Sequence, residues 1–340
     1  MTGAALPESA AQVFIWHQGA LGDVLMAGPA LQALARHYPQ ARFTLVGGVE
    51  QLSLVQTTLP VAAVWSSHRA VWLDLFQTAG PLTPGLRNLL APFDLAVVFS
   101  PQADPGFQQR LQLAGILHVI WLPSFPRQER RHIRVIQQEH LQTLGVQEQV
   151  TTWRLALPPM EVEAARQQLA AQSGGRSRWL ALAPGSGHPR KNWPLASYLE
   201  LARHLEERWQ ADVWWLLGPA ETACREPIAA SVAASDRQHL LTDLPLARLA
   251  AYLANFQVYV GNDSGLSHLA AAVGVPQVAV IFGPSDPGIW APPGALIIST
   301  PAPCAPCTTG REIACPEAVC LAQLTVPEVS RALTGKFSLL

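Results

Sequence analysis

Hydrophobic residues along the chain fall into short, nearly continuous apolar runs that alternate with longer segments of mixed polarity. In the first half these runs occupy residues 12–16, 42–46, 61–65, 94–99 and 117–121. Strands that are buried on both faces of a parallel sheet have this pattern. The segments between the runs predict helices, one at about 29–38 that opens with a proline and one at 131–144 that ends at Gly145, a residue suited to the end of a helix.

The same alternation starts again after a change in composition near 151–160, which contains Pro158-Pro159 and is typical of a linker. A polar loop at 173–178 follows. The predicted strands lie at 179–183, 212–217, 257–260 and 277–282, and the predicted helices at about 194–209, 221–234, 246–255, 264–273 and 327–333.

Two such series in tandem predict an α/β protein with two doubly wound, Rossmann-like domains. Sheets of this kind bind ligands beyond the carboxyl ends of their strands, so the two domains are expected to face each other across a cleft. We expect an N-terminal domain over residues 1–158, a C-terminal domain over 159–325 and a C-terminal helix and tail over 326–340.

Composition narrows the function. The formal net charge is −1 and charged residues make up 14% of the chain, so no broad basic surface for nucleic acid is expected. The most apolar stretch, 269–282, is interrupted by Gly274 and Pro276 and is too short to span a membrane. No basic residue precedes Arg36, so a signal peptide is not expected, and the protein is predicted to be cytoplasmic.

Several common signatures are absent from the sequence. There is no G-x-G-x-x-G, no P-loop, no H-E-x-x-H and no G-x-S-x-G, which argues against nicotinamide dehydrogenases and P-loop kinases. No D-x-D pair is present that could hold a metal ion against a diphosphate. We therefore predict no catalytic metal site.

Polar residues gather instead where predicted strands end. Asp23 follows the first strand in a glycine-containing turn, where it could contact a ligand or only cap the turn. Ser186 and Lys191 lie in the turn after strand 179–183, and Lys191 is one of only two lysines in the chain. A hydroxyl, backbone N–H groups and a cation before a helix suit a diphosphate, although the alternative is an ordinary surface loop.

Two further turns carry candidate residues. Glu221 follows strand 212–217 and could accept hydrogen bonds from ribose hydroxyls, or could only stabilise the start of the next helix. Asp263, Ser264 and Gly265 follow strand 257–260, where hydroxyl and N–H donors at a helix start favour phosphate binding. His268, one turn into that helix, is interpreted as a ligand contact rather than a buried structural histidine.

Two other clusters are ambiguous. Cys304, Cys307, Cys315 and Cys320 could bind a structural metal ion or be free thiols, since their spacing is not that of a standard zinc ribbon. A basic cluster in the first half could attract an acidic acceptor or be a solvated face; it consists of Arg127, Arg130, Arg131 and Arg134.

Taken together, these blocks resemble glycosyltransferase family 9, the ADP-heptose:lipopolysaccharide heptosyltransferases. The resemblance covers most of the chain and rests on the order and spacing of several blocks. These are GALGDVLMAGPALQALARHYPQARFTLV, RHIRVIQQEHLQTLGV, LALAPGSGHPRKNWPLASYLELARHL, WWLLGPAE, LTDLPLARLAAYLANFQVYVGNDSGLSHLAAAVGVPQVAVIFGPSDP and the cysteine-rich tail.

The resemblance implies the GT-B fold and an inverting, metal-independent transfer of a heptose from ADP-heptose, with Asp23 as general base. It adds Gly187 and Leu244, the latter beside adenine, to the donor-binding residues Ser186, Lys191, Glu221, Asp263, Ser264, Gly265 and His268. Ser186 and Ser264 stand where the family often has threonine, which keeps the hydroxyl, and Gly187 stands where some members have a second hydroxyl.

The resemblance also implies the partners. We expect a nucleotide sugar as donor, no other cofactor, and an acidic saccharide or glycolipid of the lipopolysaccharide-core type as acceptor. Contact with the cytoplasmic face of the inner membrane is left open. The alternatives are a transferase of the same fold that uses another nucleotide sugar or a protein acceptor, and a sugar-nucleotide-binding protein without catalysis.

Overall fold

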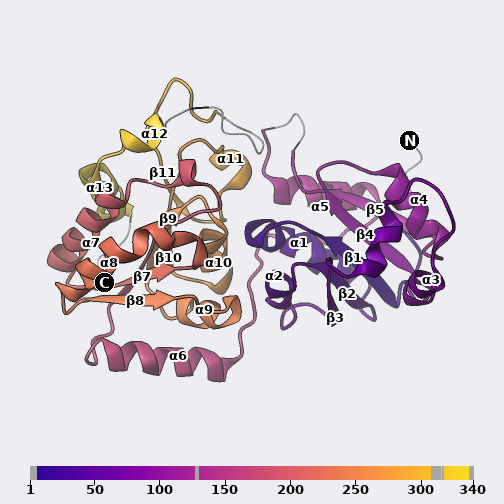
Figure 1. Cartoon of the computed structure of the whole chain (residues 1–340), viewed down its shortest axis with the longest axis horizontal. Helices are drawn as coiled ribbons and strands as arrows, with labels where there is room; N and C mark the ends of the chain where they lie inside the picture. The colour runs from indigo at the N-terminus through magenta and orange to yellow at the C-terminus, as the bar shows by residue number, and fades with distance from the viewer. Residues whose placement is uncertain (1–5, 127–129, 308–314, 316–317, 337–340) are drawn as a thin grey trace. The chain divides into compact units, whose positions relative to one another are not determined.

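The computed structural model describes residues 6–126, 130–307, 315 and 318–336, and its chain divides into two compact units, Met1–Ala156 and Leu157–Leu340. Each unit contains one parallel sheet with helices packed on it, which confirms the predicted α/β class (Figure 1). The division between the units falls two residues before the expected boundary at 158. Within the described residues, no helix has both the length and the apolar character needed to cross a membrane.

The first unit is built on a five-stranded sheet with the order β3-β2-β1-β4-β5, in which every neighbouring pair is parallel. Its strands are β1 (Gln12–His17), β2 (Arg42–Gly47), β3 (Val61–Ser66), β4 (Leu95–Ser100) and β5 (His118–Pro123). The chain reverses its direction of travel across the sheet between β1 and β4. In sheets of this kind, that position is where ligands bind.

Successive side chains of β1 point to opposite faces of the sheet. Phe14 and Trp16 contribute to a hydrophobic core with the short helices on one face. These helices are η1 (Ala70–Phe76), α3 (Pro84–Leu90) and α4 (Pro105–Leu113). Helix α1 (Leu21–His37) packs against α5 (Ile133–Thr143). The remaining helix of this unit is α2 (Val49–Ser53).

Helix α1 corrects one expectation. We expected a helix that begins at Pro29, but α1 begins at Leu21 and contains Pro29 in its interior. Proline cannot donate the usual backbone hydrogen bond there, yet ten residues of α1 are buried, and this tertiary burial outweighs local propensity. Gly28 lets the Trp153 ring approach closely, since a Cβ at Gly28 would lie 2.5 Å from that ring. Asp23 therefore lies in the first turn of a helix rather than in a loop.

The second unit has a six-stranded parallel sheet with the order β11-β10-β9-β6-β7-β8. Its strands are β6 (Trp179–Ala183), β7 (Asp212–Leu217), β8 (Gln238–Thr242), β9 (Val258–Asn262), β10 (Gln277–Ile281) and β11 (Leu296–Ile298). Its longer helices are α6 (Pro159–Gln172), α7 (Leu195–Trp209), α8 (Thr222–Ala233), α9 (Leu246–Leu253), α10 (Gly265–Val273) and α13 (Val326–Lys336), and its short ones are η2 (Pro189–Lys191), η3 (Pro219–Glu221), α11 (Pro287–Trp290) and α12 (Val319–Ala322).

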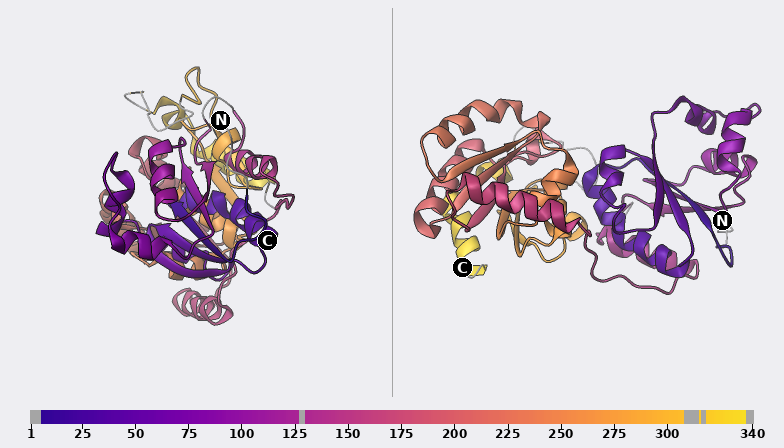
Figure 2. Two further views of the ribbon diagram at one scale, coloured as in Figure 1. Left: turned by 90° about the vertical axis from the view of Figure 1, so that its right-hand side faces the viewer. Right: turned by 90° about the horizontal axis from the view of Figure 1, so that it is seen from below.

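The order of strands places the change of direction between β6 and β9, at the centre of this sheet. Helices lie on both sides of the strands (Figure 2). One face is covered by α7 and α13, whose Val326, Val329 and Leu333 belong to the same buried core as Leu180 and Val260. Residues 326–336, expected as part of a separate tail, are therefore part of the second unit.

Apart from the short helices η2, η3, α11 and α12, one helix and two strands of the second unit were not predicted. Helix α6, which packs along α9 (Figure 1), begins at the Pro158-Pro159 pair that we interpreted as a linker. Proline is well suited to the first position of a helix, and only Ala165 and Leu169 of α6 are buried, so its apolar periodicity is weak. Strands β8 and β11 form the two edges of the sheet and are short.

Candidate functional site

Most candidate residues follow β6 and β9, the two central strands of the second unit. The segment after β6 carries Ser186, Gly187 and Lys191, and the segment after β9 carries Asp263 and the start of α10. Because β6 and β9 are parallel neighbours, their carboxyl ends reach the same edge of the sheet. This edge, at the change of chain direction, is the expected ligand position in a doubly wound sheet.

An ion pair joins the two segments directly. Lys191 Nζ lies 2.7 Å from Asp263 Oδ2, and the Asp263 side chain is 8% exposed whereas that of Lys191 is 30% exposed. The sequence suggested both residues as donor ligands but gave no sign that they contact each other. The positively charged ammonium group of Lys191 thus lies at the edge of the sheet, where a bound anion could share it with Asp263.

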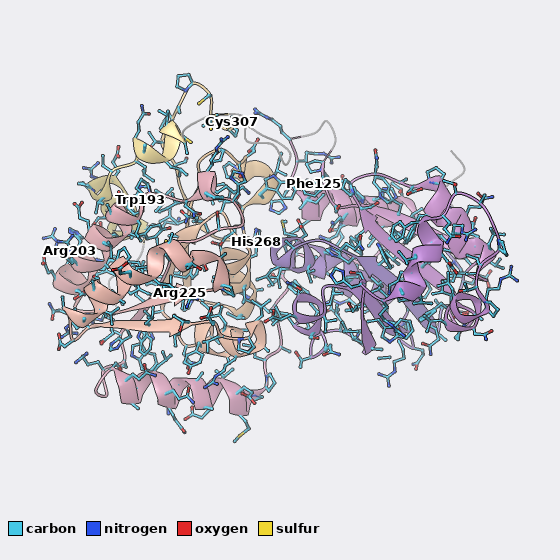
Figure 3. All side chains as sticks on the ribbon, in the orientation of Figure 1. Phe125, Trp193, Arg203, Arg225, His268 and Cys307 are labelled. Atoms are coloured by element: carbon cyan, nitrogen blue, oxygen red, sulfur yellow. The ribbon has the colours of Figure 1, made fainter. Side chains whose placement is uncertain are left out.

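Asn262, which sequence reasoning did not single out, fixes the β6 segment to β9. Its side chain is fully buried and donates from Nδ2 to the Pro184 carbonyl at 2.7 Å. Its Oδ1 accepts from Trp193 N at 3.0 Å and from the Tyr198 hydroxyl at 3.1 Å. Two of these contacts, at residues 184 and 193, bracket the segment that carries Lys191. Figure 3 labels Trp193 in this unit.

Ser186 lies in a local turn. Its hydroxyl donates to the His188 carbonyl at 2.8 Å and accepts from His188 N at 3.3 Å. Lys191 follows in η2, where its backbone N–H donates to the His188 carbonyl at 2.9 Å. Gly187 is exposed, and a Cβ there would have no neighbour within 4 Å, so the backbone is open to a ligand at this position.

Ser264 is the N-cap residue of α10, but its side chain makes no capping hydrogen bond. The Ser264 Oγ atom is buried and has no hydrogen-bond partner among the residues that the structure describes. Gly265 is the first residue of the helix. The first backbone N–H groups of a helix carry partial positive charge, so this helix start is suited to a phosphate group. His268 is buried one turn later (Figure 3).

A hydrogen-bonded pair, Tyr259 of β9 and Ser267 of α10, supports the start of this helix. The Tyr259 and Ser267 hydroxyls lie 3.1 Å apart, and Ser267 donates to the Asn262 carbonyl at 2.6 Å. Burial raises the pKa of Tyr259 to about 12, although the hydrogen bond with Ser267 lowers it in part. Tyr259 is therefore neutral near pH 7 and serves as a support for α10.

Glu221 contacts the segment after β6 from the neighbouring strand β7. Its Oε2 accepts from Gly218 N at 2.6 Å, which is the local stabilising role that we considered as an alternative. Its Oε1 lies against Gly185, because a Cβ at Gly185 would be only 1.9 Å from it. The carboxylate thus joins the end of β7 to that of β6, where it can accept hydrogen bonds from hydroxyl groups.

Leu244 is half-buried and follows Asp243 after β8. Asp243 has a left-handed backbone with φ of 51° and accepts two hydrogen bonds from Arg225 Nη2, at 2.6 and 2.8 Å. The same Arg225 nitrogen donates to the Gly218 carbonyl at 3.1 Å, so one guanidinium connects the turns after β7 and β8 (Figure 3). The Arg225 guanidinium also lowers the pKa of Asp243.

Asp23, the candidate general base, lies in the first unit. It is the third residue of α1, and its Oδ2 accepts a hydrogen bond from Ala20 N at 2.9 Å. It therefore does cap the helix, as the simpler of the two interpretations held. This hydrogen bond also holds the carboxylate beside the end of β1, the switch position of that sheet.

The structure describes the basic cluster and the cysteine cluster only in part. Arg127 lies outside the described residues, Arg131 pairs with Glu139, and burial lowers the pKa of Arg134. None of the five cysteines forms a disulfide, and the described part of the chain contains no group of three or more His, Cys, Asp or Glu residues arranged to hold a metal ion. Most of the loop between Cys307 and Cys320 lies outside the described residues.

Comparison with known proteins gives consistent results. Residues 110–317 match glycosyltransferase family 9 (heptosyltransferase). The chain is 35% identical to lipopolysaccharide heptosyltransferase 1 of Pseudomonas aeruginosa over 145 residues, which cover 42% of this chain and 39% of that protein. It is 32% identical to lipopolysaccharide heptosyltransferase 2 of Escherichia coli K12 over 293 residues, 80% of this chain and 82% of that protein.

Solved structures agree in fold. The glycosyltransferase family 9 protein of Veillonella parvula superposes with a TM-score of 0.76 at 17% identity, covering 97% of this chain and 98% of that one. Escherichia coli heptosyltransferase WaaC, solved with ADP, gives a TM-score of 0.68 at 18% identity, with 95% and 99% covered. The fold is GT-B, as the sequence resemblance implied.

Proposed function

The chain belongs to glycosyltransferase family 9, and on that premise we propose that it is an inverting heptosyltransferase that uses ADP-heptose. Its acceptor is a saccharide or glycolipid of the lipopolysaccharide-core type, reached at the cytoplasmic face of the inner membrane. The relatives named as lipopolysaccharide heptosyltransferases support this reaction. The observation that carries the proposal is the convergence of Lys191, Asp263 and the start of α10 at the switch position between β6 and β9.

The donor diphosphate binds at this convergence. The start of α10, with the buried Ser264 hydroxyl, supplies neutral hydrogen-bond donors, and Lys191 supplies the positive charge. Asp263 holds Lys191 in place before the donor arrives. When the diphosphate binds, Lys191 turns toward it, and Asp263 becomes available to hydroxyl groups of the sugar. His268 and the backbone at Gly187 complete this set.

The nucleoside binds beside the neighbouring strands. Glu221 accepts hydrogen bonds from the ribose hydroxyls, and Leu244 contacts the adenine ring with its apolar side chain. Arg225 supports both residues through its hydrogen bonds to the turns after β7 and β8. It binds Gly218, whose N–H donates to Glu221, and Asp243, which precedes Leu244. Ser186 leaves its internal turn and donates to a phosphate oxygen.

The chemical step is a single displacement with Asp23 as general base. Asp23 takes the proton of an acceptor hydroxyl while that oxygen forms a bond to the anomeric carbon of the heptose. The bond between the anomeric carbon and the β-phosphate oxygen breaks on the opposite face, and ADP leaves with the bonding electrons. Lys191 and the N–H groups of α10 stabilise the negative charge that develops on ADP, so no metal ion is required.

An assay of ADP release tests the function. The protein is incubated with ADP-heptose and lipopolysaccharide truncated before its heptoses, and ADP and the extended glycolipid are measured together. We expect equal amounts of both, much less ADP without acceptor, and an inverted anomeric configuration in the product. Release of nucleotide from UDP- or GDP-sugars but not from ADP-heptose would contradict the donor assignment, and tight ADP binding without any turnover would indicate a binding protein.

A further inference from the structure

His17 is a buried polar residue at the end of β1 that the proposed reaction does not yet use. Its side chain is 1% exposed, and its ring centroid lies 4.8 Å from that of Phe99 on the adjacent strand β4. Alternation along β1 separates it from Phe14 and Trp16, which face the other side of the sheet. A polar ring buried at a strand end needs a structural or functional reason.

The hydrogen bonding of His17 defines its chemical form. Its Nδ1 accepts a hydrogen bond from the Gly19 backbone N–H at 3.2 Å. Because only an unprotonated nitrogen can accept, this bond requires Nδ1 without a proton, which assigns the proton of the neutral ring to Nε2, a buried atom without a hydrogen-bond partner among the described residues. Burial acts in the same direction and lowers the pKa of His17 to about 4, although backbone groups of His17 and Asp23 oppose part of this shift.

Gly19 lies between this ring and the Asp23 side chain. A Cβ at Gly19 would lie 2.7 Å from Cε1 of His17 and 2.5 Å from Cβ of Asp23, so only glycine fits between the two side chains. The next residue, Ala20, donates its N–H to Asp23 Oδ2 at 2.9 Å. The turn from β1 to α1 therefore links the imidazole to the carboxylate through two consecutive backbone N–H groups.

We propose that His17 is a positioning residue for Asp23. By accepting the hydrogen bond from the Gly19 N–H, it fixes the turn at residues 18–20, which in turn orients the Asp23 carboxylate. This role rests on the proposed function of Asp23 as the general base. A neutral acceptor is suited to it, because it orients the turn without placing a cation beside the base. A carboxylate that is displaced by about 1 Å can lose about 100-fold in rate, so the orientation of this turn affects turnover directly.

Two variants separate hydrogen bonding from packing. His17→Phe keeps an aromatic ring in the same space and removes the acceptor, whereas His17→Asn keeps an acceptor oxygen where Nδ1 lies. We expect His17→Phe to lower kcat by about 10- to 100-fold with an unchanged KM for ADP-heptose. His17→Asn should retain most of the wild-type kcat. The circular dichroism spectrum and denaturation midpoint of each variant, compared with those of wild type, show whether the first unit is folded, and calorimetric titration with ADP checks the second unit, which carries all the proposed ADP ligands.

Three kinetic results would overturn the positioning role. They are a wild-type kcat in a folded His17→Phe protein, equal losses of kcat in both variants, and a loss that lies in the KM for ADP-heptose. Nitrogen-15 spectra test independently of turnover which ring nitrogen of His17 carries the proton. The His17 signals are assigned as those that are absent in His17→Asn. A ring protonated on Nδ1 at pH 7 also overturns the proposal. If wild-type protein releases no ADP from ADP-heptose at all, it is the proposed function that fails.

Discussion

Lys191 and Asp263 show what a single sequence can and cannot reveal about a residue. Lys191 was identified because it is one of two lysines in the chain and follows a strand. Its partner could not be identified, since 72 residues separate the two and only the order of strands brings them together. Asn262 was missed for a similar reason, because its partners at 184, 193 and 198 all belong to a distant segment of the sequence.

Replacement of Lys191 should weaken donor binding. A hydrogen bond to a charged group contributes about 1.5–3 kcal/mol, so Lys191→Ala should raise the Kd for ADP by about 10- to 100-fold. Lys336→Ala is the matched control, because Lys336 is the other lysine of the chain and lies at the end of α13. Calorimetric titration of both variants with ADP measures the effect. An unchanged affinity in Lys191→Ala would make Lys191 an ordinary surface residue.

Replacement of Asp23 should affect turnover and leave donor binding intact. Asp23→Asn keeps the size of the side chain but cannot take a proton, and general-base catalysis contributes about 10²- to 10⁴-fold. We expect kcat for transfer to fall by that factor, while the Kd for ADP stays at the wild-type value. If a folded Asp23→Asn protein retains turnover within a few-fold, the carboxylate only caps α1 and another residue is the base.

The neutral His17 predicts a specific sensitivity to acid. Its pKa is lowered to about 4 in the folded protein from 6.5, so the unfolded chain binds the proton more strongly. Its contribution to stability is complete above pH 6.5 and is lost as the pH falls toward 4, with a decrease of about 2 kcal/mol between pH 7 and pH 5. The denaturation midpoint should therefore decrease less between pH 7 and pH 5 in His17→Asn than in wild type. Equal decreases would contradict the neutral buried ring.

At the scale of elements, apolar runs located most central strands to within one or two residues, because a strand buried on both faces has little freedom in composition. The start of α1 and the whole of α6 were not predicted, since proline at 29 and the proline pair at 158 and 159 are ordinarily signs of a helix start and of a linker. In α1 tertiary burial decided the outcome, whereas α6 buries only two residues and begins where proline suits the first helical position.

The segment after β6 depends on the close approach of Glu221 to Gly185. Gly185→Ala would place a methyl group 1.9 Å from Glu221 Oε1, so the carboxylate must move away. We expect weaker ADP binding with little change in the Kd for inorganic diphosphate, because the proposed partner of Glu221 is the ribose and not the phosphates. Gly335→Ala in α13 is the control, since a Cβ there has no neighbour within 4 Å. Equal effects on both ligands would argue against the ribose role of Glu221.

At the scale of the whole molecule, the tandem series of strands and helices was sufficient to predict two parallel sheets, and the blocks at the strand ends were sufficient to predict the family. The identity of the acceptor within its expected class could not be predicted. Three short elements that the sequence did not reveal, η1, α3 and α4, lie between residues 46 and 131, outside the blocks that carry the family resemblance.

Removal of divalent metal ions should leave the activity largely unchanged. In the proposed mechanism Lys191 and the start of α10 stabilise the charge on the leaving ADP, and the described residues include no group of three metal-ligating side chains. Transfer measured before and after treatment with a chelator, with ADP binding as control, checks this. Loss of turnover with retained ADP binding would indicate a catalytic metal ion.

Selective protection of Lys191 tests most directly the central claim, that ADP-heptose binds at the carboxyl ends of β6 and β9. An amine-reactive reagent labels the two lysines, and mass spectrometry measures each peptide with ADP, with UDP and without nucleotide. ADP at about ten times its Kd leaves about a tenth of the sites empty, so labelling of Lys191 should fall about tenfold while Lys336 is unaffected. UDP at the same concentration should protect Lys191 much less. Unchanged labelling of Lys191 at an ADP concentration that calorimetry shows to be saturating would contradict the account.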